Sequence, residues 1–155
     1  MVLKEGKKAP DFALNDWKGD VFKLYDSTSN YTIVYFYPKD STPGCTIEAN
    51  EFSGVLSEFK KLGVAVIGIS GGDEKSKKKF CEKNELHVTL LSDQEFKVCN
   101  NYKVYGEKKF MGRKYQGIFR VTYVLDNDKK ILKIYDNVSA TGHAQEVLDY
   151  IKGLS

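Results

Sequence analysis

The chain has 155 residues, of which 41% are hydrophobic and 29% charged, and its formal net charge is +3. This composition is typical of a globular protein and excludes a disordered or collagen-like chain. The charge is too small for a polyanion-binding surface, no apolar run has the length of a membrane span, and the N-terminus turns polar after three residues. We therefore expect one domain over residues 1–155, located in the cytoplasm, with neither nucleic acid nor a membrane as a partner.

The first half of the chain alternates predicted strands and helices. In order, these are an N-terminal hairpin over 12–14 and 21–24, a strand over 32–37, a helix over 45–62 and a strand over 64–69. Both later strands are continuous apolar runs, which are typical of strands covered on both faces. The helix is predicted to end at Gly63. A strand-helix-strand unit of this kind implies parallel strands and a right-handed crossover.

The second half continues the alternation. In order, we expect a polar surface helix over 73–84, a strand over 88–91, a helix over 95–102, a loop or weak extended segment over 103–117, a hairpin over 121–125 and 131–135, and a helix over 143–152. The basic run 75–79 is expected to be a solvated helix face. This order of elements is that of an α/β, thioredoxin-like fold with an N-terminal hairpin and an inserted strand-helix. Fold alone assigns no function.

The segment from Pro38 to Cys45 carries the candidate chemistry, because it joins the first buried strand to its helix. Thr42 suits the N-cap and Pro43 the first helical position. Cys45 then lies in the first turn, where unpaired backbone N–H groups and the helix dipole favour a thiolate over a thiol. A nucleophilic cysteine needs this activation. The alternative is a small hydrophobic residue that begins the apolar face of the helix.

The spacing Pro-x-x-x-Thr-x-x-Cys, formed by Pro38, Thr42 and Cys45, resembles the active-site motif of the peroxiredoxins. Residues 6–14 and 117–126 resemble the N-terminal signature and the arginine-bearing strand of that family. The length of the chain and the details of these motifs resemble one branch of the family, the bacterioferritin comigratory protein or Q-type peroxiredoxins. The resemblance implies a thiol peroxidase that reduces hydrogen peroxide and small organic hydroperoxides. It also implies no cofactor, a monomer, and thioredoxin or a similar dithiol as the reductant.

The resemblance further implies a role for each motif residue. Cys45, as a thiolate, attacks a peroxide oxygen and becomes a sulfenic acid. Thr42 directs its hydroxyl at the thiolate and the peroxide, and Pro38 shields the thiolate from water. Arg120 begins a strand antiparallel to the first buried strand, so we expect its guanidinium at the loop, where it stabilises the thiolate and the developing oxyanion. Backbone N–H groups of Gly44 and Cys45 complete the oxyanion site.

The second cysteine of the reaction is assigned by the same resemblance. Many members of the branch carry it five residues after the first, but that position here is Asn50. Some members place the resolving cysteine in the following helix, in a setting like residues 78–83, which implies Cys81 and an intramolecular disulfide. Cysteines on separate helices are expected to lie more than about 7 Å apart between Cα atoms, so the bridge requires local unwinding. The alternative is a Cys81 that only packs beside Phe80.

Other residues are weaker candidates. His87 and His143 have no cysteine or carboxylate at ligand spacing, so no metal site is expected. Cys99 is expected to be a packed small residue. Two other functions stay open. One is a one-cysteine peroxidase; the other is a non-catalytic thioredoxin-fold binding module that uses the basic run 75–79 and the aromatic-rich segment 102–119 as its surface.

Overall fold

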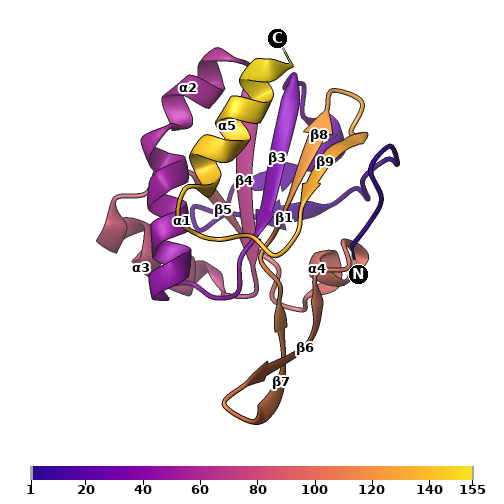
Figure 1. The fold of residues 1–155 in the computed structure, drawn as a ribbon. Coiled ribbons are helices and arrows are strands. Elements are labelled where there is room, and N and C mark those ends of the chain that lie inside the picture. Colours follow the sequence, from indigo (N-terminus) through magenta and orange to yellow (C-terminus); the bar gives the residue numbers. More distant parts are fainter. Residues whose placement is uncertain (1, 155) are drawn as a thin grey trace.

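The computed structural model describes residues 2–154, and a mixed β-sheet forms the centre of this part of the chain (Figure 1). Neighbouring strands follow the order β2-β1-β5-β4-β3-β8-β9. These strands are β1 (Ala13–Asn15), β2 (Val21–Lys23), β3 (Tyr31–Phe36), β4 (Val64–Ser70), β5 (Thr89–Ser92), β8 (Val121–Asp126) and β9 (Ile131–Tyr135). A separate hairpin consists of β6 (Tyr105–Phe110) and β7 (Arg113–Ile118). The helices are α1 (Pro43–Gly54), α2 (Leu56–Lys61), α3 (Glu74–Asn84), α4 (Lys97–Asn101), α5 (His143–Gly153) and the 3-10 turn η1 (Leu24–Asp26).

Strand β3 lies in the interior of the sheet, and every residue after its first is buried. It pairs parallel with β4 and antiparallel with β8, as the sequence predicts. Phe36, at the carboxyl end of β3, is opposite Val121, the first residue of β8. Arg120 therefore lies next to the loop that follows β3, although it is far from that loop in the sequence.

The two faces of the sheet bury separate hydrophobic clusters. Side chains of β3 alternate between them, because successive residues of a strand point to opposite faces. The first cluster lies beneath α1, α2, α3 and α5, and it contains both Cys45 and Cys81. The second cluster includes residues of α4 and contains Cys99. The sheet thus separates Cys99 from the other two cysteines.

The predicted helix over 45–62 is wrong as a single element. The structure contains two helices, α1 and α2, which meet at Val55. Gly54 and the β-branched Val55 have low helix propensity, which explains a break at this point. The predicted end is confirmed, because Gly63 follows α2 with a φ of 73°.

Of the two alternatives expected over 103–117, a loop or a weak extended segment, the structure confirms the extended one. Residues 105–118 form the antiparallel hairpin β6–β7, which projects from the body of the molecule (Figure 1). Its turn at Met111 and Gly112 has positive φ at both residues. Because most of the hairpin is exposed, its sequence lacks the apolar alternation that identifies a half-buried strand.

The remaining predicted elements are found within a few residues of their expected ends. The N-terminal hairpin, the strand-helix pair β5 and α4, the hairpin β8–β9 and the C-terminal helix are all present. No helix within residues 2–154 has the length and hydrophobicity needed to cross a membrane.

Candidate active site

Cys45 lies in the first turn of α1, which begins at Pro43 with Thr42 at the N-cap position. Only 1% of Cys45 is exposed. The first amide to bond back to the preceding turn is that of Thr46, which donates to the Thr42 carbonyl at 2.9 Å. The N–H groups of Gly44 and Cys45 come before it and have no acceptor within the helix. The Cys45 sulfur therefore lies at the positive end of α1.

Thr42 is the N-cap residue of α1, as the sequence predicts, but its hydroxyl makes no capping hydrogen bond. It donates instead to the Lys39 carbonyl at 2.9 Å and thereby closes the loop before α1. The hydroxyl forms no hydrogen bond with Cys45 in this arrangement. Its oxygen keeps lone pairs that can accept a hydrogen bond from a bound peroxide.

Pro38 marks the point where the chain leaves the sheet. The Tyr37 amide makes the last sheet hydrogen bond, to the Ile69 carbonyl at 3.1 Å. Pro38 has no N–H group to continue this ladder, and it is half-buried between the sheet and the loop. The loop therefore turns towards α1 immediately after β3.

Arg120 connects the Cys45 sulfur to a buried carboxylate. Its Nη2 lies 3.4 Å from Cys45 Sγ, and its Nη1 donates to Glu48 Oε1 at 2.6 Å. The guanidinium is held at both ends of its planar fork, which fixes its orientation. A Cβ atom on Gly44 would lie 3.2 Å from Arg120 Nη2, so a glycine at this position leaves room for the guanidinium.

Glu48 is a candidate site residue that the sequence reasoning missed. It lies three residues after Cys45 and therefore on the same face of α1. The side chain is fully buried, and within residues 2–154 its Oε2 has no hydrogen-bond partner. Burial raises the pKa of Glu48 to about 7, although Arg120 acts to lower it. The available signal was an acidic residue on the apolar face of the predicted helix.

The raised pKa of Glu48 predicts a pH-dependent stability. Burial favours the protonated carboxyl of Glu48 in the folded state. The free energy of unfolding that this proton contributes is therefore fully present below pH 4.5 and is lost as the pH rises through about 7. The loss amounts to about 3 kcal/mol. We expect Glu48→Gln to remove this loss, so that denaturant unfolding at pH 5 and pH 8 gives a smaller difference in the variant than in the wild type. If the free energy of unfolding changes equally between the two pH values in both proteins, Glu48 does not titrate with a raised pKa.

Cys81 is buried in α3 and belongs to the same cluster as Cys45. Burial, with a contribution from Asp40, raises the pKa of its thiol to about 11. Cys81 is therefore a thiol at neutral pH while α3 is folded. Cys45 and Cys81 are not bonded to each other. Cys81 can become a nucleophile only after it has left this buried position.

Cys99 is a packed residue of α4, as the sequence predicts. Burial, together with Asp93, raises the pKa of its thiol. His143 is also buried, and its ring nitrogens contact Thr122 Oγ1 at 2.8 Å and Glu146 Oε1 at 2.9 Å. Within the described part of the chain, no three metal-ligating side chains gather into a possible metal site.

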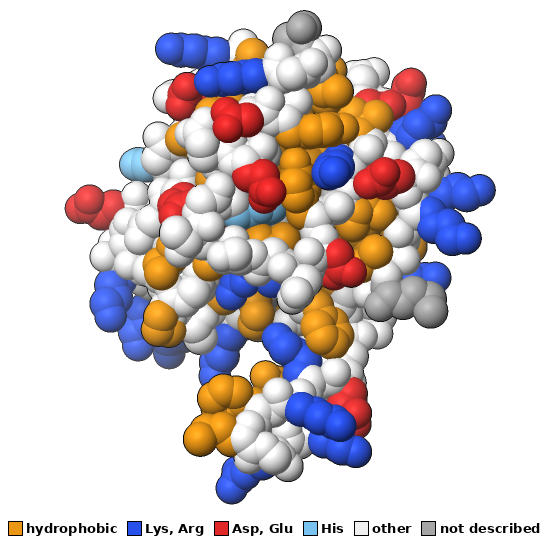
Figure 2. All heavy atoms as spheres, viewed as in Figure 1, with side chains coloured by type: hydrophobic (Ala, Val, Ile, Leu, Met, Phe, Trp, Pro, Cys, Tyr) orange, Lys and Arg blue, Asp and Glu red, His pale blue; other side chains and the backbone are white. Residues whose placement is uncertain are grey.

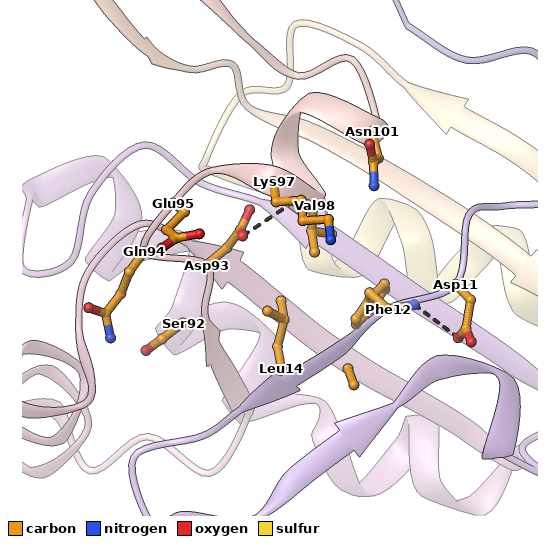
Figure 3. Close-up of a pocket in the computed structure, with 11 residues that line it drawn as sticks. Asp11, Phe12, Leu14, Ser92, Asp93, Gln94, Glu95, Lys97, Val98 and Asn101 are labelled. Atoms are coloured by element: carbon orange, nitrogen blue, oxygen red, sulfur yellow. Dashed lines mark hydrogen bonds between the residues drawn. The ribbon is translucent and has the colours of Figure 1, made fainter.

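Two surface features lie outside this site. A cavity of about 470 Å³ lies between the segments 11–14 and 92–101 (Figure 3). In it Asp93 accepts hydrogen bonds from the amides of Val98 and Cys99, on the side of the sheet away from Cys45. The second feature is the β6–β7 hairpin, where apolar and basic side chains are exposed together (Figure 2).

The chain is similar to known proteins over most of its length. Residues 5–134 match the AhpC/TSA family. Peroxiredoxin Bcp of Escherichia coli K12 is 42% identical over 150 residues, which cover 97% of this chain and 96% of that protein. A putative peroxiredoxin bcp of Helicobacter pylori strain J99 is 42% identical over 147 residues, with coverages of 95% and 97%.

Solved structures of similar proteins also align with this chain over most of its length. The bacterioferritin comigratory protein of Xanthomonas campestris, described for its alkyl peroxide reduction activity, aligns with a TM-score of 0.86 at 33% identity. The alignment covers 92% of this chain and 91% of that one. A mutant PrxQ of Xylella fastidiosa aligns with a TM-score of 0.93 at 30% identity, with coverages of 99% and 98%. These similarities confirm the predicted α/β, thioredoxin-like fold.

Proposed function

Because this chain belongs to the AhpC/TSA family and is a peroxiredoxin, a thiol peroxidase, we propose that Cys45 is the residue its reaction oxidises. The observation that supports this most strongly is the contact of 3.4 Å between Cys45 Sγ and Arg120 Nη2 at the start of α1. A guanidinium and unpaired helix amides both stabilise negative charge on sulfur. Neither of the other cysteines has such surroundings.

In the proposed oxidation, the Cys45 thiolate attacks one oxygen of the peroxide. The S–O bond forms as the O–O bond breaks, and the leaving oxygen takes up a proton to give water or an alcohol. Arg120 and the amides of Gly44 and Cys45 stabilise the charge that develops on the oxygens. The Thr42 hydroxyl accepts a hydrogen bond from the peroxide, and Pro38 keeps water from the thiolate. Cys45 is left as a sulfenic acid.

In the proposed resolution, the Cys81 thiol attacks the sulfenic sulfur of Cys45. A disulfide forms, the sulfenic oxygen leaves as water, and a dithiol protein such as thioredoxin then reduces the bridge. The position of Cys81 on the same face of the sheet as Cys45 supports this assignment, whereas the sheet separates Cys99 from both. The high pKa of Cys81 supports a step that first unwinds α3.

The Cys81 assignment predicts a specific loss of turnover. Cys81→Ser should reduce one peroxide per chain and then stop with thioredoxin as the reductant, because no disulfide forms for thioredoxin to attack. Peroxide consumption at substoichiometric peroxide measures the first oxidation of Cys45, and consumption at excess peroxide measures the turnover with thioredoxin. Cys99→Ser is the matched control and should keep full turnover. Sustained turnover by Cys81→Ser at the wild-type rate would favour the one-cysteine mechanism instead.

We further propose that hydrogen peroxide and small alkyl hydroperoxides are the substrates, by analogy with the alkyl peroxide reduction described for the Xanthomonas campestris relative. We also propose a monomer of one domain over residues 1–155 that acts in the cytoplasm, without nucleic acid or a membrane. The non-catalytic binding module conflicts with the family of this chain. An assay of peroxide consumption with dithiothreitol tests it, because a binding module shows no turnover and no effect of Cys45→Ser.

A further inference from the structure

A buried ion pair joins the active-site loop to the helix that carries Cys81. Lys77 lies in α3, one turn before Cys81, and its side chain is 0% exposed. Its Nζ is 3.2 Å from Oδ2 of Asp40, whose side chain is 2% exposed. Asp40 lies in the loop between Pro38 and Thr42. The prediction that the run 75–79 is a solvated face is therefore wrong at Lys77.

The ammonium of Lys77 bonds to three separate segments. Besides Asp40, it donates to Ser70 Oγ at 2.6 Å, at the end of β4, and to the Gly72 carbonyl at 3.2 Å, in the turn before α3. A lysine ammonium has three N–H donors, so each has an acceptor here. These contacts account for a charge that is otherwise costly to bury.

The carboxylate of Asp40 is equally well paired. Its Oδ1 accepts from the Tyr37 hydroxyl at 2.5 Å, and its Oδ2 accepts from Ser76 Oγ at 2.9 Å. A Cβ atom on Gly72 would lie 2.0 Å from Oδ2, so the network fits closely against the turn before α3. The Asp40 carboxylate thus connects the end of β3 and the active-site loop to the first turns of α3.

The rest of α3 is weakly attached to the core. Its buried residues are Lys77, Phe80 and Cys81 alone among the described residues of the helix, while Lys78 and Lys79 are exposed. Lys77 lies one turn before Cys81, so unwinding of α3 that reaches this turn withdraws Lys77 from Asp40, and a buried carboxylate left without its cation is strongly destabilising. Two apolar side chains alone would hold the helix much less firmly.

We propose that the Lys77–Asp40 pair is a latch with two effects: it anchors the active-site loop for the oxidation of Cys45, and it holds α3 against that loop and so limits the rate at which Cys81 reaches the oxidised Cys45. This inference rests on the proposed role of Cys81 as the resolving cysteine. The latch changes no bond of the reaction. Lys77 acts as a positioning residue, because it touches neither the peroxide nor the reacting sulfur atoms.

The test separates the two chemical steps after mixing reduced protein with one equivalent of hydrogen peroxide. Samples quenched with an alkylating reagent are analysed by intact mass, which distinguishes thiol, sulfenic acid and disulfide. Lys77→Met keeps an unbranched side chain and helix propensity but removes the charge. We expect disulfide formation to accelerate about tenfold or more, because the helix loses its buried pair. We expect the oxidation of Cys45 to slow, because the loop around Asp40 loses its anchor.

Two variants in the same helix are the controls. Lys78→Met makes the same change at an exposed lysine and should alter neither step. Lys79→Gly weakens α3 without touching Asp40, so it should accelerate disulfide formation but leave the oxidation of Cys45 unchanged. The latch is contradicted if Lys77→Met behaves like Lys78→Met, or if it leaves the oxidation step unchanged as Lys79→Gly does.

Two further measurements keep the outcomes distinct. If reduced Lys77→Met does not fold, Ser76→Ala is measured instead. This variant removes one hydrogen bond to Asp40, so it should slow the oxidation and accelerate disulfide formation by a smaller factor; unchanged rates would overturn the latch.

Wild-type protein is analysed first, by peptide mapping. Absence of a bridge between Cys45 and Cys81 there contradicts the proposed resolution itself, whereas a wild-type bridge with no effect of Lys77→Met contradicts the latch only.

Discussion

Cys45→Ser is expected to reduce the rate of peroxide consumption by roughly 10³-fold or more, because a serine hydroxyl does not ionise at neutral pH and is a poor nucleophile. The hydroxyl would occupy the same buried position beside Arg120, so the fold and the guanidinium contacts should change little. A coupled assay with thioredoxin, its reductase and NADPH measures the rate.

The matched control for this experiment is Cys99→Ser, which makes the same substitution at a buried cysteine on the opposite face of the sheet. It is expected to keep the wild-type peroxide rate, provided that the variant is shown to fold. A Cys45→Ser variant that still consumes peroxide at a rate close to wild type would exclude Cys45 as the nucleophile.

Arg120→Ala should slow the reaction of the protein with peroxide about 10²-fold, because one donor to the developing negative charge is lost. The second-order rate is measured by stopped-flow with excess peroxide. Arg120→Lys should recover only part of the rate, because an ammonium cannot hold both Cys45 and Glu48 in a planar fork.

Removing Arg120 also leaves Glu48 buried without a cation, so stability must be measured beside activity. Arg113→Ala is the matched control, since it removes an arginine from the exposed face of β7 and should leave the peroxide rate unchanged. If Arg120→Ala folds and reacts with peroxide as fast as the control, the guanidinium has no part in the chemistry.

The sequence allowed the centre of the fold to be predicted because burial there is uniform. Strands β3 and β4 consist almost wholly of apolar, β-branched and aromatic residues, and such runs are recognised without knowledge of their neighbours. Strand β8 is recognised from the Asp- and Asn-rich turn that joins it to β9. The contact between Arg120 and Cys45 followed from topology, because adjacent antiparallel strands bring the start of one beside the end of the other. The hairpin β6–β7 could not be found in this way, since both of its strands are largely exposed.

The polar network around the site was much less accessible from sequence. Lys77 stands in a run of lysines that is charged at every position except one, and nothing in that run distinguishes the buried side chain from its exposed neighbours. Its partner Asp40 lies 37 positions away, in the loop between β3 and α1. A threonine hydroxyl at an N-cap can accept a hydrogen bond from an amide of the first helical turn, or it can donate one to a nearby carbonyl. The backbone geometry of the loop selects the second, with the Lys39 carbonyl as the acceptor.

The most direct test of the proposed mechanism is peptide mapping of wild-type protein after one equivalent of hydrogen peroxide, with free thiols blocked before digestion. The mechanism predicts one peptide pair joined through Cys45 and Cys81, with Cys99 recovered as the blocked thiol. A pair joined through Cys45 and Cys99, or a Cys45 that is oxidised to sulfenic acid and joined to no other cysteine, would contradict it.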